Sequence, residues 1–285
     1  MRYWVLNRED GKLINEKSVP LGIKFINQKN FENILVNELQ DYLSEKLIID
    51  ILCCGMIGSK QGWKESGYFS VPFTPEFYKK FLFINTKNKK LNVYIVPGLK
   101  QKNPPDVMRG EETQALGIIK KYKNFDGVVC FTGTHSKWLQ IVNNEIISFE
   151  TFMTGELFEI ISQYSILKNS ISTKKIDVHL ATEYALIAFS DPHKYSKNLF
   201  ELRAKNLIDN LNSKEVLSCL SGLTIGLEIA GSRKYWLGNE VTLVGSSPMV
   251  DIYDLILTKQ NIATKIHDSK NLSLIGLKDI YKNLN

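Results

Sequence analysis

A short polar segment that directly follows the apolar sequence VVCF has the residue types of a phosphate-binding loop. It consists of Gly133, Thr134, His135, Ser136 and Lys137. A glycine at the end of a buried strand lets the backbone approach a ligand, and hydroxyls and successive amides can donate hydrogen bonds to phosphate oxygens. The lysine adds a point charge. The same residues also fit a polar connection between two strands, and composition alone does not decide between these interpretations.

A second candidate loop, in the same half of the chain, contains Gly245, Ser246 and Ser247. It lies between the strand-like sequence VTLV and a predicted helix that begins at Pro248, a residue favoured at the first helical position. The N-terminus of a helix attracts phosphate and nucleoside groups. This segment alone is weak support for a nucleotide site. The support is stronger because the segment 133–137 lies in the same half of the chain.

The loop sequence GMIGSKQGW in the first half could bind an anion or a polyol. Its glycines loosen the backbone after a buried strand, its polar side chains offer hydrogen-bond donors, and its Trp could form an apolar wall for a sugar ring. The alternative is an ordinary exit from a strand with a half-buried Trp. The candidate binding residues are Gly55, Met56, Ser59, Lys60, Gln61 and Trp63.

Charged residues also gather in the sequence PPDVMRGEETQ. Arg109 could clamp a carboxylate through two parallel hydrogen bonds, and Asp106 or Glu111 could accept a hydroxyl proton during group transfer. The alternative is that the acids stabilise the first turn of a helix. That explanation fits the sequence FMTGELF better still, where we expect Thr154 to cap a helix and Glu156 to complement its dipole.

The elements that must position these residues alternate between strands and helices. In the first half, the pattern predicts a hairpin with its turn at Asp10-Gly11, then buried strands and amphipathic helices. The hairpin covers residues 2–19, the strands 47–54, 91–97 and 126–132, and the helices 31–46 and 110–122. This alternation favours an α/β fold.

The second half repeats this order. A hairpin at 138–152, with its turn at Asn143-Asn144, precedes several helices and two further strands. We expect Ser213 to cap the longest helix, and Gly222 and Gly226 to mark a close neighbour along it. The helices are predicted at 155–167, 178–189, 198–211, 213–235, 248–260 and from about 274, and the strands at 240–247 and 262–266.

Composition excludes several classes of protein. The chain has 285 residues, 44% of them hydrophobic, which suffices for a substantial core. No apolar run is long enough to span a membrane, and the start lacks a signal-peptide pattern, so a cytoplasmic protein without a membrane partner is expected. The net charge of +6 comes mainly from scattered lysines, which argues against nucleic-acid binding. The four cysteines lack the spacing of a zinc site, and no metal site is predicted.

Several sequence blocks follow one another along the chain: GMIGSKQGW, VPGL with PDVMRGEETQ, GTHSKW, TFMTGELF, LFELRA, LSGLTIG and LVGSSPMVDIY. Together they resemble the 2-dehydro-3-deoxygalactonokinase family, from about Tyr3 to the last helix. The resemblance implies an α/β, two-domain actin-like ATPase and sugar-kinase fold built from ribonuclease H-like repeats, with ATP in the cleft between the domains. It also implies an enzyme of galactonate catabolism, which uses ATP and Mg²⁺ to phosphorylate 2-dehydro-3-deoxy-D-galactonate at its 6-hydroxyl.

The resemblance assigns roles to the candidate residues. It implies that residues 133–137 form a phosphate loop and that residues 245–247 bind the nucleotide. It also implies that Arg109 and the 55–63 loop bind the sugar acid. Asp106 and Glu111 become candidates for the catalytic carboxylate. The expected domains are a sugar-acid-binding lobe at 1–124 and a nucleotide-binding lobe at 125–285. The expected partners are small molecules, and homo-oligomerisation is left open.

The sequence departs from the family pattern at its start. Members usually begin with a strand that ends in an Asp-Trp-Gly-Thr type segment, a first phosphate loop, whereas the opening sequence RYWVLN matches the second strand. Without the first strand, its neighbours should lack backbone partners, and phosphoryl transfer should be slowed. This difference leaves an alternative function, that of a noncatalytic nucleotide-binding or sugar-acid-binding protein derived from such a kinase.

Overall fold

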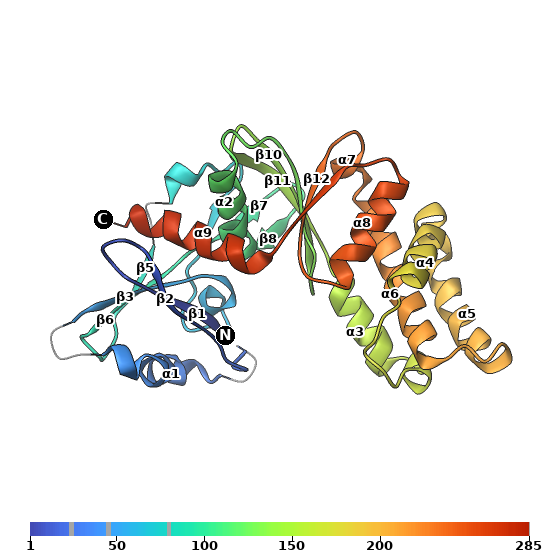
Figure 1. Ribbon diagram of the computed structural model, residues 1–285, viewed down its shortest axis with the longest axis horizontal. Coiled ribbons are helices and arrows are strands. Elements are labelled where there is room, and N and C mark those ends of the chain that lie inside the picture. The colour runs from blue at the N-terminus through green and yellow to red at the C-terminus, as the bar shows by residue number, and fades with distance from the viewer. Residues whose placement is uncertain (23–25, 44–46, 79–80, 285) are drawn as a thin grey trace. The chain divides into compact units, whose positions relative to one another are not determined.

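The computed structural model describes residues 1–22, 26–43, 47–78 and 81–284. The chain divides into two compact units, each with its own sheets and helices (Figure 1). One unit contains Met1–Phe125 and Lys270–Asn285, and the other contains Asp126–Ser269. No helix in the described ranges combines the length and the apolar character that a bilayer crossing requires.

The last helix groups with the first unit, whereas the sequence placed residues 125–285 in one lobe. This helix, α9 (Ser269–Lys282), packs against α2 (Glu111–Lys121) with almost no space between the backbones. A Cβ atom added at Gly276 would lie 1.9 Å from the Thr113 carbonyl oxygen, and one added at Gly117 would lie 2.2 Å from that of Leu272. Lys120 Nζ and Asp279 Oδ1 add an ion pair at 2.8 Å.

The first unit is built from short strands in three small sheets. The hairpin predicted at 2–19 is present, with an antiparallel pair on either side of Gly11. The described strands form the orders β1-β2, β3-β6-β5 and β4-β7-β8. Their bounds are β1 (Arg2–Leu6), β2 (Leu13–Ser18), β3 (Ile49–Cys53), β4 (Tyr68–Ser70), β5 (Leu82–Ile84), β6 (Leu91–Ile95), β7 (Gly98–Gln101) and β8 (Asp106–Met108).

The length of one helix and the pairing of two strands in this unit were not predicted from the sequence. The helix expected at 31–46 ends early: α1 covers Phe31–Glu38, a 3-10 turn covers Gln40–Tyr42, and residues 44–46 lie outside the described ones. Among the described strands, β1 pairs only with β2, and β3 pairs only with β6.

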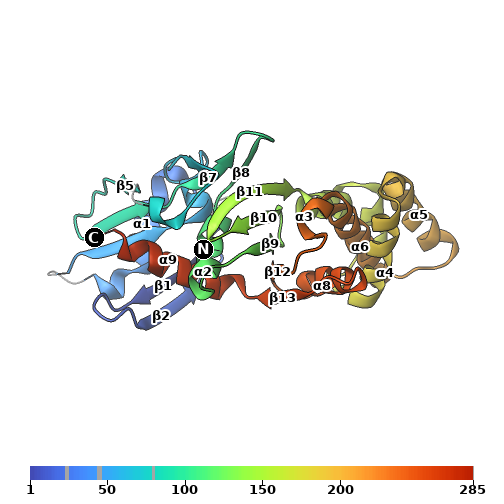
Figure 2. The same cartoon turned by 90° about the horizontal axis from the view of Figure 1, so that it is seen from above.

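The second unit contains a five-stranded mixed sheet in the order β11-β10-β9-β12-β13 (Figure 2). β9, β12 and β13 run parallel. In the predicted hairpin, β10 pairs antiparallel with both β9 and β11, and Asn143 and Asn144 have positive φ in its turn. Positive φ suits asparagine at a tight turn. The strands are β9 (Gly127–Phe131), β10 (Ser136–Val142), β11 (Glu145–Phe152), β12 (Val241–Val244) and β13 (Thr264–His267).

The helices of this unit pack against one another, and some of them also pack against the sheet. Figure 1 shows α4, α5 and α6 side by side. α4, α6 and α8 share a core with the sheet that includes Trp138 and Tyr253, both almost fully buried, whereas α5 packs in a separate helical cluster. The helices are α3 (Thr154–Tyr164), α4 (Val178–Ser190), α5 (Tyr195–Ile208), α6 (Ser213–Gly231), α7 (Arg233–Trp236) and α8 (Met249–Lys259).

The glycines of α6 confirm the prediction of a close neighbour. A Cβ atom at Gly222 would lie 2.0 Å from the Ala181 carbonyl oxygen, and one at Gly226 would lie 2.1 Å from that of Ala185, so α4 rests directly on α6. The predicted cap was wrong by one residue. The side chain of Asn212, not Ser213, accepts the first backbone amides of α6, and Glu215 completes a capping box.

Candidate functional site

The two candidate loops of the second unit leave adjacent parallel strands at the same edge of the sheet. Phe131 at the end of β9 is in register with Val244 at the end of β12. The Thr132 amide and hydroxyl both donate to the Val244 carbonyl oxygen, at 2.9 and 3.3 Å. A Cβ atom at Gly245 would lie 2.1 Å from Thr132 Oγ1, so a side chain at this position would have to displace the Thr132 side chain. Ligands of open α/β sheets bind outside the carboxyl ends of such strands.

The tip of the first loop is exposed and rests on the first turn of α3. Gly133, Thr134 and His135 are exposed, and the Glu156 amide donates to the Thr134 carbonyl oxygen at 3.0 Å. His135 Nε2 lies 2.5 Å from Glu156 Oε2. A Cβ atom at Gly155 would lie 2.5 Å from the Gly133 carbonyl oxygen, whereas one at Gly133 would meet no atom within 4 Å. The loop is therefore seated against a helix N-terminus, with open space in front of Gly133.

The other two residues of this loop point into the protein. Ser136 is fully buried, and its hydroxyl lies 3.2 Å from the Tyr253 hydroxyl. Lys137 is 5% exposed, and its ammonium donates to the His135 carbonyl oxygen at 3.3 Å. These two side chains therefore have protein partners, and the residues exposed to solvent are 133–135.

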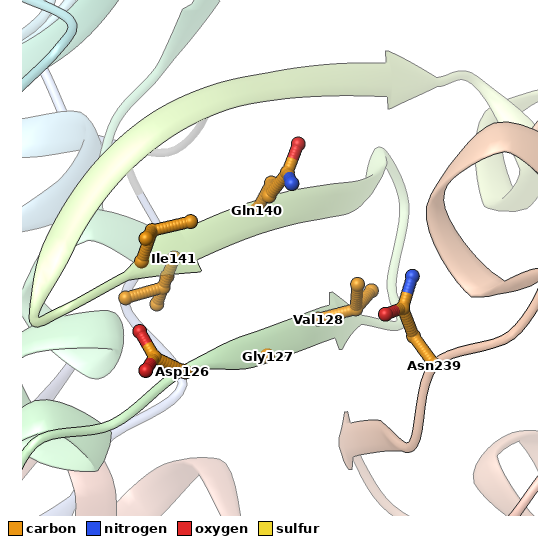
Figure 3. Close-up of a pocket in the computed structure, with 7 residues that line it drawn as sticks. Asp126, Gly127, Val128, Gln140, Ile141 and Asn239 are labelled. Atoms are coloured by element: carbon orange, nitrogen blue, oxygen red, sulfur yellow. The ribbon is translucent and has the colours of Figure 1, made fainter.

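A shallow cavity of about 250 Å³ lies elsewhere on this sheet. Figure 3 shows Asp126 and Gly127 before and at the start of β9, with Ile141 beside them on β10. Because the candidate loop follows the other end of β9, this cavity is not part of the candidate site.

In the first unit, the structure brings the 55–63 loop and Arg109 together. Gly55 and Gly110 both have positive φ, and a Cβ atom at Gly110 would lie 3.3 Å from Gly55 Cα. A Cβ atom at Gly58 would lie 2.7 Å from Arg109 Nη1. Two segments that are about fifty residues apart in sequence thus meet through their glycines.

Most of the Arg109 guanidinium is occupied by contacts with other residues of the protein. Arg109 is 8% exposed, Nη1 donates to Ser66 Oγ at 2.5 Å, and Nη2 donates to the Gly67 carbonyl oxygen at 2.9 Å. The guanidinium carbon lies 4.4 Å from the centre of the Tyr68 ring. Within the described residues, Nε is buried without a hydrogen-bond partner. Arg109 therefore braces the 58–68 segment, and Nε is the group left for a further acceptor.

The candidate residues of the 55–63 loop separate into exposed and packed groups. Met56, Lys60 and Gln61 are exposed. Ser59 is buried and donates to the Met56 carbonyl oxygen at 2.8 Å. Trp63 is half-buried and stacks on Phe31 of α1, with ring centres 6.1 Å apart, as the ordinary loop interpretation also expects.

The two candidate catalytic carboxylates occupy different places. Asp106 begins β8, and its Oδ1 accepts the Val107 amide at 2.7 Å. Glu111 begins α2, and its Oε2 accepts the Arg109 amide at 3.2 Å. Glu111 is therefore the one that lies beside the contact of Gly55 with Gly110.

Comparison with known proteins identifies the family. The family described as 2-keto-3-deoxy-galactonokinase matches residues 1–280. This chain belongs to the 2-keto-3-deoxy-galactonokinase family. It is 33% identical over 285 residues to "Probable 2-dehydro-3-deoxygalactonokinase DgoK1" of Rhizobium meliloti (strain 1021), covering 97% of this chain and 91% of that one. It is 29% identical over 258 residues to the 2-dehydro-3-deoxygalactonokinase of Escherichia coli (strain K12), covering 89% of this chain and 84% of that one.

A solved structure agrees with this assignment. The crystal structure of a candidate 2-dehydro-3-deoxygalactonokinase from Sinorhizobium meliloti superposes with a TM-score of 0.90 at 32% identity, covering 99% of this chain and 94% of that one. The recognition made from the sequence blocks, and the α/β two-domain kinase fold expected from it, are confirmed.

Two buried carboxylates of this 2-keto-3-deoxy-galactonokinase family member were missed as functional candidates. Glu112 is fully buried beneath the turn at Gly110, whose amide donates to Oε2, and Thr113 Oγ1 donates to Oε1 at 3.0 Å. Burial, and then the charge of Glu111, raises the pKa of Glu112 to about 7. Because Glu112 directly follows Glu111, the sequence indicated only a further acid that stabilises the first turn of a helix.

Glu228 of α6 is the second. It is 2% exposed, and Oε1 accepts Trp138 Nε1 at 2.8 Å. Oε2 accepts the Tyr253 hydroxyl at 2.6 Å and also the Thr154 hydroxyl. Burial raises the pKa of Glu228, although these hydrogen bonds act in the opposite direction. A single acid within the apolar sequence LTIGLEIAG was the available signal.

The contact with Glu228 corrects the role expected for Thr154. Met153 occupies the N-cap position of α3 without a side-chain cap, and the Thr154 hydroxyl points into the core. Glu156 does lie in the first turn of α3, as expected.

Proposed function

We propose that this chain transfers the γ-phosphoryl group of ATP to the 6-hydroxyl of 2-dehydro-3-deoxy-D-galactonate, in the cytoplasm. The observation that carries the proposal is the meeting of two glycine loops, Thr132–His135 and Gly245–Ser247, at the carboxyl edge of one sheet. The names of the relatives supply the substrate. A kinase of this kind needs a site for phosphates and a site for the acceptor sugar acid.

The second unit would hold the nucleotide. The exposed amides of Gly133, Thr134 and His135 would bind phosphate oxygens, together with the Thr134 hydroxyl and the N-terminus of α3. Lys137 would contribute its charge from within the loop, and Ser246 and Ser247 would lie on the nucleoside side. These donors fit a polyphosphate because they combine open backbone with a helix N-terminus.

Mg²⁺ fits this site through the phosphates rather than through a cage of side chains. In the part of the chain that the structure describes, His, Cys, Asp and Glu side chains nowhere gather in groups of three that could hold a metal ion. Mg²⁺ usually keeps several waters and binds one or two carboxylates with substrate phosphates. When bound, ATP and Mg²⁺ supply the phosphoryl group and neutralise its developing charge.

The first unit would hold the sugar acid. Lys60 and Gln61 would bind its carboxylate and hydroxyls, and Met56 and Trp63 would form apolar walls of the site. Gly55 and Ser59 would shape the loop, and buried Arg109 Nε would face the remaining acceptor. We assign the role of accepting the hydroxyl proton to Glu111, which lies beside this loop, with Asp106 as the second candidate.

A coupled assay of ADP release tests this function. The purified chain with ATP, Mg²⁺ and 2-dehydro-3-deoxy-D-galactonate should produce ADP at a rate that depends on the sugar acid. The C4 epimer, 2-dehydro-3-deoxy-D-gluconate, measures the choice of acceptor. Binding of ATP by calorimetry without ADP release would contradict the proposal and would indicate a noncatalytic binding protein.

The substitution Gly133→Ala tests the placement of the phosphates. Because the new methyl group meets no protein atom within 4 Å and the backbone φ is ordinary, the melting temperature should stay unchanged. The methyl group would occupy space assigned to the phosphates, so KM for ATP should rise about tenfold, a loss comparable with one good hydrogen bond. An unchanged KM for ATP would place the phosphates elsewhere.

A further inference from the structure

We propose that Glu228 is a positioning residue for the phosphate loop, acting through Tyr253, Ser136 and Thr154. The inference rests on the proposed function, because it takes the 133–135 segment as the phosphate site. Glu228 is 2% exposed, so it acts through other residues and does not itself reach the nucleotide.

Glu228 connects the elements that surround the loop. Glu228 lies on α6, Trp138 on β10 just after the loop, Thr154 at the start of α3, and Tyr253 on α8. These elements are separated by many residues in sequence, and all three partners bond to the same carboxyl group. The loop itself lies between the end of β9 and the start of β10, and it rests on α3.

The hydroxyl groups of this network donate in one direction, toward Glu228. The Tyr253 and Thr154 hydroxyls both donate to Glu228 Oε2, so their hydrogens point toward this oxygen. The Tyr253 oxygen can then only accept from Ser136, at 3.2 Å. The Ser136 hydroxyl hydrogen is therefore held inward, and one carboxylate sets the orientation of the whole chain of hydroxyls.

The consequence for the phosphate loop follows from this orientation. Ser136 anchors the end of the loop to the core instead of donating its hydroxyl hydrogen to the nucleotide. The loop donors are left to the backbone amides and to Thr134, at the exposed tip. Donors that are already oriented cost little reorganisation when the ligand binds.

This hydrogen-bond network should affect ligand binding as well as stability. A buried charge is costly unless donors satisfy it, and removing one partner leaves the rest of the network unsatisfied. Because Ser136 and Thr154 belong to the segments directly attached to the loop or beneath it, the resulting shift should reach the amides of 133–135.

The substitutions Tyr253→Phe and Glu228→Gln test the inference. Phenylalanine keeps the ring of Tyr253 but removes both its bond to Glu228 and its bond to Ser136. Glutamine keeps one oxygen but turns an amino group toward Thr154 or Trp138, so the chain of donors must reverse or break. Both variants should raise KM for ATP and the calorimetric Kd for ATP about tenfold, as expected for hydrogen bonds to a charged group. KM for the sugar acid should stay within about twofold, well below that effect.

Tyr195→Phe is the matched control. It removes a tyrosine hydroxyl bonded to Thr224 Oγ1 at 3.1 Å, in the same unit but within the helical cluster of α5 and α6. This variant should lower the melting temperature without changing the affinity for ATP. An ATP Kd for Tyr253→Phe and Glu228→Gln equal to that of Tyr195→Phe, or tighter ATP binding in Glu228→Gln, would overturn the inference.

Gly133→Ala separates this inference from the proposed function. If Gly133→Ala weakens ATP binding while Tyr253→Phe and Glu228→Gln do not, the phosphate site stands and the positioning role of Glu228 is wrong. If ATP binding is unaffected by all three substitutions, the assignment of phosphates to 133–135 is itself overturned, and the positioning role with it.

Discussion

Glu112 and Glu228 show at the scale of single residues that burial and partners decide what an acid does. Both are almost fully buried, and burial is the largest cause of the raised pKa in each. Glu228 accepts from side chains that include Trp138, Thr154 and Tyr253. Glu112 accepts from the Thr113 hydroxyl and from the backbone at Gly110, and it lies near the charge of Glu111. The turn at 109–112 therefore contains an acid that titrates near neutral pH.

The raised pKa of Glu112 predicts a particular dependence of stability on pH. Since the pKa of Glu112 is about 7 in the folded protein and the ordinary value for glutamate is 4.5, folding favours the protonated acid. This contribution is fully present below about pH 4.5 and is lost as the pH rises through about 7. The loss is on the order of 3 kcal/mol across that window, because each pKa unit corresponds to about 1.4 kcal/mol.

The substitution Glu112→Gln should remove this dependence. Urea unfolding of both proteins at several pH values between 4.5 and 8 gives the difference in their unfolding free energies. We expect the native protein to lose stability relative to the variant as the pH rises, whatever constant offset the amide introduces. A difference that stays constant with pH would contradict a pKa near 7 for Glu112.

The partners of Arg109 could not be predicted from the sequence. Its charge and its place in PPDVMRGEETQ suggested an open clamp, but its terminal nitrogens bond to Ser66 and Gly67, and Tyr68 stacks on it. The sequence contained no sign of these partners, because they lie more than forty residues away.

At the scale of elements, the two hairpins and most of the long helices were predicted, whereas the short strands were not, and the helix expected at 31–46 ends at Glu38. The hairpins at Gly11 and at Asn143-Asn144 follow from turn residues that tolerate positive φ. In contrast, β4, β5 and β8 have three residues each, too few to show an alternating pattern. They become strands because neighbouring strands pair with them.

Contact between α4 and α6 gives a prediction at this scale. In Gly226→Ala the new methyl group would lie 2.1 Å from the Ala185 carbonyl oxygen, so the helices must separate. The free energy of unfolding should fall by about 1–3 kcal/mol, the usual cost of overpacking. Gly231→Ala on the same helix is the control, because its added methyl group would meet the Phe152 side chain at 3.0 Å and not a backbone atom, so it should lower stability less than Gly226→Ala. Equal effects of the two substitutions in denaturant unfolding would argue against this helix contact.

At the scale of the whole molecule, the chain returns at its end to the unit in which it began. α9 closes on α2 through Gly117 and Gly276, and Tyr281 donates to Asp50 Oδ2 at 2.7 Å. The sequence pattern at the end of the chain predicts only one more amphipathic helix after a strand of the second unit. An amphipathic pattern does not specify the surface on which a helix packs, so the pattern did not reveal the unit to which α9 belongs.

The substitution Gly276→Ala should therefore weaken the first unit alone. Its methyl group would lie 1.9 Å from the Thr113 carbonyl oxygen and would push α9 off α2. Hydrogen exchange should become faster in α2, with exchange in β9 of the second unit unchanged. Asn271→Ala, at an exposed position of the same helix, is the control and should leave both patterns unchanged. Faster exchange in β9 would show that α9 also supports the second unit.

The sequence by itself determined the family, the alternation of strands and helices, and the positions of the glycine loops. These features depend on local preferences and on the order of residues within short blocks. Only the tertiary structure decided that Ser136 and Lys137 point inward, that Thr154 bonds to Glu228, and that α9 joins the first unit. The physical reason is that burial and hydrogen-bond partners arise between residues far apart in the chain, such as Trp138 and Glu228, which are 90 positions apart.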